Sequence, residues 1–221
     1  MEPVFRDRRD AGRRLAALLG HLAGDPELLV LGLPRGGVPV AAEVAAALGA
    51  PLDLYVVRKL GAPGRRELAM GAIASGGVRV LNEPVAARIP RAVVEEVARA
   101  EERKLEHSER ALRGDRPAPA IRGRTVLLVD DGIATGSTVR SAIAALRTLQ
   151  AGRIVVAVPV VAPETRDDLA HEVDEVVAVV TPEPMAAISL WYENFSQTAD
   201  EEVRRLLEQA ARNPREPSAP P

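Results

Sequence analysis

The sequence predicts an α/β protein built on an open, mostly parallel five-stranded sheet with helices on both faces. Two observations support this prediction. Runs of β-branched and aliphatic residues, such as 126–129 and 154–161, show no polar alternation, which is typical of strands buried on both faces. Segments with helical periodicity separate these runs, as crossover connections between parallel strands require. We expect one domain over residues 1–212, followed by a disordered Pro-rich tail over 213–221.

The expected elements alternate along the chain. Apolar periodicity predicts helices over 7–20, 38–48, 90–113, 139–149, 164–171 and 199–211. Short apolar runs predict strands over 28–33, 52–57, 70–74, 78–81, 126–129, 154–161 and 173–180, of which the third and fourth form a hairpin. Gly49 stands where a helix-ending glycine belongs, and Pro90 and Gly114 bracket the long charged helix.

The composition excludes several classes of protein. A net charge of −2 argues against a surface that wraps nucleic acid. The absence of cysteine excludes disulfides and thiolate metal sites, and the three histidines show no ligand spacing. No stretch approaches the roughly 20 apolar residues of a membrane span. We therefore expect a cytoplasmic protein that binds neither membrane nor nucleic acid.

The most informative segment is 126–138, VLLVDDGIATGST. Its apolar run ends in Asp130 and Asp131, and a loop of small and hydroxyl residues then leads into a helix. A helix N-terminus after such a turn presents backbone N–H groups and a positive dipole end to an anion. The loop has neither a Walker lysine nor the Rossmann glycine spacing. It therefore predicts a seat for a sugar phosphate, with the two acids accepting hydrogen bonds from sugar hydroxyls.

This segment resembles the signature with which type I phosphoribosyltransferases bind phosphoribosyl pyrophosphate (PRPP). The resemblance spans roughly residues 5–210. It implies the type I phosphoribosyltransferase fold, with a flexible-loop hairpin and a small C-terminal hood at about 181–198. It implies that Asp130, Asp131 and Lys59 are catalytic. The PRPP phosphate would be bound by Gly132, Ile133, Ala134, Thr135, Gly136, Ser137 and Thr138.

A second loop, 34–39, follows the first buried strand and resembles the pyrophosphate loop of the family. Its glycines allow close approach of the backbone to a ligand. Lys59 is one of only two lysines in the chain, and its ammonium is a suitable point charge for phosphate oxygens. The resemblance gives the pyrophosphate-binding residues as Arg35, Gly36, Gly37, Arg58 and Lys59. A ligand-free glycine turn and a lysine that merely ends a strand are the alternatives.

The Gly- and Pro-rich loop over 61–67 matches the position of the family's flexible catalytic loop. Such a loop could close over the substrate and exclude water. Arg65, Arg66 and Glu67 would then lie in the closing loop, with the two arginines meeting the pyrophosphate. Equally, these residues could be solvated charges.

Three of the five aromatic residues fall within 191–195, after the last predicted strand. In the family this region often receives the base, and ring stacking holds a flat heterocycle. Trp191 and Tyr192 are therefore predicted base-binding residues. The alternative is that these rings anchor the C-terminal helix to the core.

The resemblance implies an enzyme of nucleotide metabolism, a glycosyltransferase of the pentosyltransferase class. It would transfer phosphoribose from PRPP to a nitrogenous base with Mg2+, or run in reverse. Mg2+ would be held mainly by the substrate, so no protein metal site is predicted. Ala134 replaces the general-base aspartate of 6-oxopurine transferases, which argues against hypoxanthine or guanine. We expect a homodimer, as is usual in the family. The alternatives are a non-catalytic PRPP- or nucleotide-binding regulator of the same fold, and a sugar-phosphate hydrolase or phosphorylase.

Overall fold

Five parallel strands form the central sheet, in the order β2-β1-β6-β7-β8. The computed structural model describes residues 4–212, without the side chains of Arg66 and Glu67. The predicted tail over 213–221 lies outside the described residues. The strands are β1 (Leu28–Gly32), β2 (Leu52–Leu54), β6 (Thr125–Val129), β7 (Arg153–Val160) and β8 (Glu175–Val180). The predicted parallel five-stranded sheet is confirmed.

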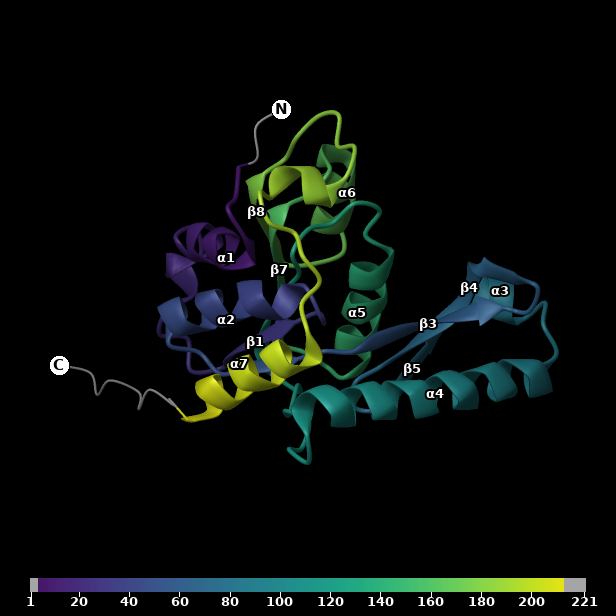
Figure 1. Cartoon of the computed structure of the whole chain (residues 1–221). Helices are drawn as coiled ribbons and strands as arrows, with labels where there is room; N and C mark the ends of the chain where they lie inside the picture. The colour runs from purple at the N-terminus through teal and green to yellow at the C-terminus, as the bar shows by residue number, and fades with distance from the viewer. Residues whose placement is uncertain (1–3, 213–221) are drawn as a thin grey trace.

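Helices cover both faces of this sheet (Figure 1). They are α1 (Arg8–Ala16), α2 (Gly37–Leu48), α5 (Ser137–Thr148), α6 (Pro163–Ala170) and α7 (Asp200–Arg212), with short 3-10 helices η1 (Gly20–Leu22) and η2 (Ile188–Trp191). Alternate residues of β1 face opposite ways, so that Val30 packs with α1, α2 and α7 whereas Leu31 packs with α5 and α6. The predicted helix-ending glycine is confirmed, because Gly49 has φ +66° at the end of α2.

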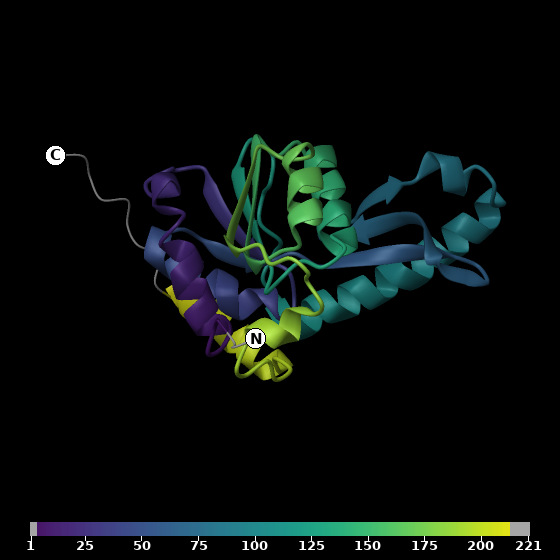
Figure 2. The same ribbon diagram turned by 90° about the horizontal axis from the view of Figure 1, so that it is seen from above.

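An arm formed by residues 57–113 extends from one side of the core (Figures 1 and 2). It contains the antiparallel sheet β3 (Val57–Ala62), β4 (Arg65–Ala74) and β5 (Val78–Leu81), then α3 (Glu83–Ala86) and α4 (Arg91–Arg113). The predicted hairpin and long charged helix are both confirmed. Leu60 and Met70 of the sheet and Leu105 of α4 belong to one buried cluster, which holds the helix against the strands.

Two predictions about this region are wrong. The expected strand over 52–57 is divided between β2 and β3, which belong to different sheets. The division occurs at Val56, because its N–H donates to Ser75 Oγ and its carbonyl accepts from Ser75 N, both at 2.8 Å. The expected loop over 61–67 is mostly strand, with only Pro63 and Gly64 between β3 and β4.

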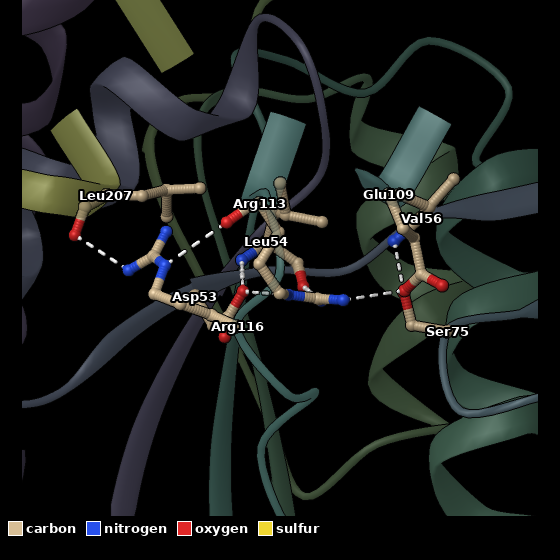
Figure 3. A network of polar contacts seen from close by, with 8 residues as sticks. All are labelled: Asp53, Leu54, Val56, Ser75, Glu109, Arg113, Arg116 and Leu207. Carbon is tan, nitrogen blue, oxygen red and sulfur yellow. Dashed lines mark hydrogen bonds and ion pairs between the residues drawn. The ribbon is translucent and has the colours of Figure 1, made fainter. Parts of the chain in front are cut away.

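A buried polar network fastens the arm to the core (Figure 3). The Arg113 side chain, at the end of α4, is only 4% exposed. It donates to Asp53 Oδ1 at 2.9 Å, to Glu109 Oε1 at 2.9 Å and to the Leu54 carbonyl at 3.0 Å. Arg116 then joins the Arg113 carbonyl to the Leu207 carbonyl of α7, both at 3.2 Å. One guanidinium thus ties the arm to the edge strand β2.

The segment predicted as the hood, 181–198, is bound to the N-terminal residues of the chain. It contains η2, and Tyr192 forms a parallel bridge with Phe5. The amide of Phe5 donates to the Trp191 carbonyl at 2.9 Å. The N-terminal residue Phe5 is thereby joined to the segment that follows β8. Within residues 4–212, none of the helices has the length and apolar character that crossing a bilayer requires.

We expect Arg113→Ala to lower the free energy of unfolding by about 3–5 kcal/mol, because it leaves a half-buried carboxylate and a buried carbonyl without their donor. Urea denaturation followed by circular dichroism measures this. Arg110→Ala, at an exposed position one turn earlier on α4, is the matched control and should change stability by about 0.5 kcal/mol or less. Equal effects of the two substitutions would contradict a role for Arg113 in fastening the arm.

Candidate active site

The predicted phosphate loop lies between the end of β6 at Val129 and the start of α5 at Ser137. Ile133 anchors it to the neighbouring strand, because its N–H donates to the Val160 carbonyl at 2.8 Å. Among the described residues, the five consecutive N–H groups from Ala134 to Thr138 have no acceptor. The side chains of Thr135, Ser137 and Thr138 are exposed beside them. This row of free donors at a helix N-terminus is suited to bind an anion.

Asp130 and Asp131 lie at the edge of this loop and are held differently. Asp130 Oδ1 accepts from the Asp131 N–H at 2.9 Å. Asp131 Oδ2 accepts from Arg8 Nε at 2.7 Å, and the side chains of this ion pair are only 14% and 12% exposed. The Tyr192 hydroxyl donates to the Asp131 carbonyl at 2.5 Å. Asp131 Oδ1 has no donor within the described part of the chain, so it can accept a ligand hydroxyl.

The surroundings of the acid pair shift the pKa values of Asp130 and of the neighbouring Tyr192. Burial, and next the charge of Asp131, raise the pKa of Asp130 well above its usual range. The Tyr192 hydroxyl also has a raised pKa, first through burial and then through the charge of Asp131. It therefore stays protonated and remains a donor. The site thus concentrates negative charge at a half-buried position, which favours ligands that bring hydroxyl donors or a cation.

The turn over 34–37 packs directly against the acids. A Cβ at Gly36 would overlap Asp131 Oδ2, and one at Gly37 would lie 2.8 Å from Asp130 Cα. Glycine is therefore required at both positions for the two loops to meet. The Pro34–Arg35 peptide bond is cis. The structure thus brings the predicted phosphate loop and pyrophosphate loop together.

A cavity of about 290 Å³ opens beside this turn. It brings together Arg35 and Arg58, both predicted from the sequence, with Thr138 of the phosphate loop. His107 and Ser108 of α4 form part of its wall and were not predicted. They belong to a charged helix whose sequence does not show which of its faces meets the cavity.

Both cavity arginines are paired with carboxylates. Arg35 Nε lies 2.6 Å from Asp200 Oδ1 at the start of α7, and Arg58 Nε lies 2.7 Å from Glu101 Oε2 of α4. Neither carboxylate was predicted, because both are remote in sequence from their partners. Lys59 lies on the opposite face of β3 from Arg58, the face that carries Val57 and packs toward α5.

The residues predicted for the flexible loop lie at the start of β4, beyond the tip of the β3–β4 hairpin. Arg65 is exposed there. The hairpin leaves the cavity at Val57, and the strand from there to Ala62 spans roughly 17 Å. Contact between Arg65 and the cavity would therefore require the hairpin to bend. Closure by Arg65, Arg66 and Glu67 stays a prediction.

The aromatic segment favours the anchoring role over base binding for two of its rings. Trp191 and Tyr192 are 8% and 5% exposed and pack with Phe5 in one cluster. Stacking on a base needs an open ring face, which these residues lack. Phe195 is half-buried, lies 4.9 Å from the Tyr192 ring and has the Arg8 guanidinium 4.0 Å from its centroid. Its ring therefore lies at the ion pair that holds Asp131.

Comparison with known proteins identifies this arrangement. The family model for the phosphoribosyl transferase domain matches residues 7–189, which include both loops and the acid pair. The chain belongs to the phosphoribosyl transferase family. The predicted type I phosphoribosyltransferase fold is thereby confirmed, and the family's chemistry is that of a pentosyltransferase.

Similarity to individual relatives extends over nearly the whole of this phosphoribosyl transferase family member. Two Mycobacterium tuberculosis proteins, from different strains and provisionally named phosphoribosyl transferases, are each 45% identical over 212 residues. The match covers 95% of this chain, which spans about half (48%) of the length of those relatives. The crystal structure of TT1426 from Thermus thermophilus is 41% identical and superposes with a TM-score of 0.82, covering 95% of this chain and 99% of that one.

We expect Asp130→Asn to stabilise the protein at pH 7 to 8. The raised pKa means that the folded state holds the Asp130 proton more tightly than the unfolded state, so its contribution to stability falls as pH rises between the two pKa values. Each kcal/mol gained should raise the melting temperature by roughly 2–4 °C. The gain should disappear below about pH 3.9, the ordinary aspartate pKa, where both states are protonated.

Thermal unfolding over this pH range measures the effect. Asp115→Asn, at an exposed position, is the control and should give no such pH-dependent gain. A gain for Asp130→Asn that does not depend on pH would contradict the assignment of the raised pKa.

Proposed function

We propose that this chain transfers phosphoribose from PRPP to a nitrogenous base with the help of Mg2+, releasing pyrophosphate. The observation that carries the proposal is the row of five free N–H groups from Ala134 to Thr138, adjoining an acid pair and a cavity lined by two arginines. An anion seat, a pair of hydroxyl acceptors and a pocket with two arginines would correspond to the three parts of PRPP. We further propose that it acts in nucleotide metabolism in the cytoplasm, as a homodimer.

The phosphate loop would hold the 5-phosphate through its amides, assisted by the hydroxyls of Ser137 and Thr138. These donors are fixed by the backbone before the ligand arrives, so little reorganisation opposes binding. Asp131 Oδ1 and the Asp130 carboxylate would accept hydrogen bonds from the ribose hydroxyls. The ion pair with Arg8 orients Asp131 from behind, and its low exposure makes it a lasting part of the site.

Pyrophosphate would enter the cavity and meet Arg35 and Arg58. A contact with Lys59, on the opposite face of β3, would require that strand to move. The Arg35 side chain is 44% exposed and that of Asp200 is 35% exposed, so their ion pair contributes about 0–1 kcal/mol. Because breaking this ion pair costs so little, a pyrophosphate of higher negative charge can take the place of the Asp200 carboxylate beside Arg35. Charge-assisted contacts to phosphate oxygens are stronger than those between exposed side chains. The paired state of Arg35 is therefore compatible with its proposed role.

The residues at this site fit a magnesium ion that arrives with its substrate. Within the described part of the chain, no group of three or more His, Asp or Glu side chains could hold a metal by itself. The Asp130 and Asp131 carboxylates supply hard oxygen donors next to the pyrophosphate cavity. Mg2+ keeps several waters and binds phosphate oxygens readily, so two carboxylates suffice as its protein contacts. When bound, it would neutralise charge on the leaving group.

A panel of purine and pyrimidine bases, each supplied with PRPP and Mg2+, tests the proposal. We expect pyrophosphate release that depends on one of the bases and falls at least about 100-fold in Asp131→Asn, because the carboxylate charge that strengthens the ribose hydrogen bond and pairs with Arg8 is lost. Release that requires no base would indicate a hydrolase instead. Tight PRPP binding without turnover of any base would favour a regulatory protein and contradict catalysis.

The contact between the two loops gives a second test. Gly36→Ala places a methyl group on Asp131 Oδ2 and should lower PRPP affinity by about 10-fold or more, while the circular dichroism spectrum stays that of the parent. Gly20→Ala is the matched control, because a Cβ there meets nothing within 4 Å. Calorimetric titration with PRPP and Mg2+ measures both. Unchanged affinity in Gly36→Ala would show that Asp131 does not contact the ligand.

A further inference from the structure

We propose that Arg140 and Thr165 are positioning residues of the phosphate loop. They hold the carbonyl groups of Ala134 and Thr135 away from the anion seat, so that the N–H groups on the other side of the loop face the 5-phosphate. This inference rests on the proposed function and names two residues that neither the loop motif nor the acid pair includes.

Four consecutive carbonyls of the loop, from Ile133 to Gly136, all have donors within the protein. The Ile133 carbonyl accepts from Ala162 N at 3.3 Å, and the Gly136 carbonyl accepts from Arg140 N at 2.8 Å. The two between them depend on side chains. Thr165 Oγ1 donates to the Ala134 carbonyl at 2.7 Å, and Arg140 Nη1 donates to the Thr135 carbonyl at 2.9 Å.

The amides of the same stretch show the opposite pattern. From Ala134 to Thr138, none of the N–H groups has an acceptor among the described residues. The loop thus has its carbonyl groups bound to the protein and its N–H groups free to bind a ligand. A peptide unit that turned over would place a carbonyl oxygen in the seat, where it would repel a phosphate oxygen. The two side-chain hydrogen bonds oppose that rotation.

Arg140 is itself fixed by acids on and beyond α6. Its Nε donates to Glu172 Oε1 at 2.7 Å, and its Nη2 donates to Asp168 Oδ2 at 3.1 Å. Its Nη1 donates to the Thr135 carbonyl, so each of the three guanidinium nitrogens donates to a different acceptor. A lysine has the same charge but cannot reproduce this planar fork. The role of Arg140 therefore depends on its geometry as well as its charge.

Gly136 gives independent evidence that the loop lies tightly on these two side chains. Its φ is +72°, a conformation that favours glycine. A Cβ there would lie 3.0 Å from Thr165 Cγ2 and 3.2 Å from Arg140 Nη1. The side chains thus form the outer support of the turn, and the glycine allows the turn to rest on them.

Three substitutions at two positions separate positioning from charge. Thr165→Val keeps the shape of the side chain and removes the hydroxyl donor, whereas Thr165→Ser keeps the donor. Arg140→Lys keeps the charge and loses the fork. Ribose 5-phosphate and pyrophosphate with Mg2+ serve as separate probes of the two halves of the site, titrated by calorimetry into the full chain. Thermal melts confirm that each variant is folded.

We expect Thr165→Val and Arg140→Lys to weaken binding of ribose 5-phosphate about 5- to 20-fold and to change pyrophosphate binding by less than twofold. Thr165→Ser should bind ribose 5-phosphate as the parent does. Equal affinity of Thr165→Val, Arg140→Lys and the parent for ribose 5-phosphate would overturn the positioning role. So would an equal loss for both probes, because that would indicate a general disturbance of the fold. If the parent itself binds neither probe, the proposed function fails.

Discussion

The close contact between the glycine turn after β1 and the acid pair after β6 is the constraint on which the site depends. Parallel neighbours in a sheet end at the same edge, so β1 and β6 deliver these two loops side by side. A side chain at Gly36 or Gly37 would push them apart. The loops thereby bring the row of free amides, the pair of carboxylates and the cavity that contains Arg35 and Arg58 to one edge of the sheet.

Both ends of the chain complete this arrangement. Arg8, at the start of α1, holds Asp131 and also donates to the Ser196 carbonyl at 2.7 Å. Asp200, at the start of α7, holds Arg35 of the glycine turn. The site therefore draws on the first and last helices as well as on the two loops. This coupling has a cost, because it buries Asp130 beside a second carboxylate and raises its pKa. Structural stability is given up where binding chemistry is needed, as is common at functional sites.

Local patterns in the sequence were sufficient for the sheet, the phosphate loop and the glycine turn. Each of these features arises from residues adjacent in the chain, where apolar runs, paired acids and glycines have direct conformational meaning. Arg8, Glu101, His107 and Asp200 were missed because they reach the site only through tertiary packing of helices. The division of 52–57 was missed for the same reason, since the partner of Val56 is Ser75, across the arm. The aromatic residues 191–195 were recognised as a cluster, but only their burial in the structure favours anchoring.

The arm changes how the cavity should be understood. Its helix α4 supplies His107 and Ser108 to the cavity wall, and its strand β3 carries Arg58 toward α4 and Lys59 toward α5. The network around Arg113 fixes the base of that helix to β2, next to the residues that line the cavity. A movement of the arm about this base would therefore change the cavity, and it would also reach the phosphate loop through α5, whose Val139 and Ile143 share a buried cluster with Val57 of β3. The two halves of the proposed PRPP site thus share a support in α5, whereas the hydrogen bond from Thr165 to the Ala134 carbonyl holds the phosphate loop alone. A substitution at Thr165 should therefore affect chiefly the phosphate half of the ligand.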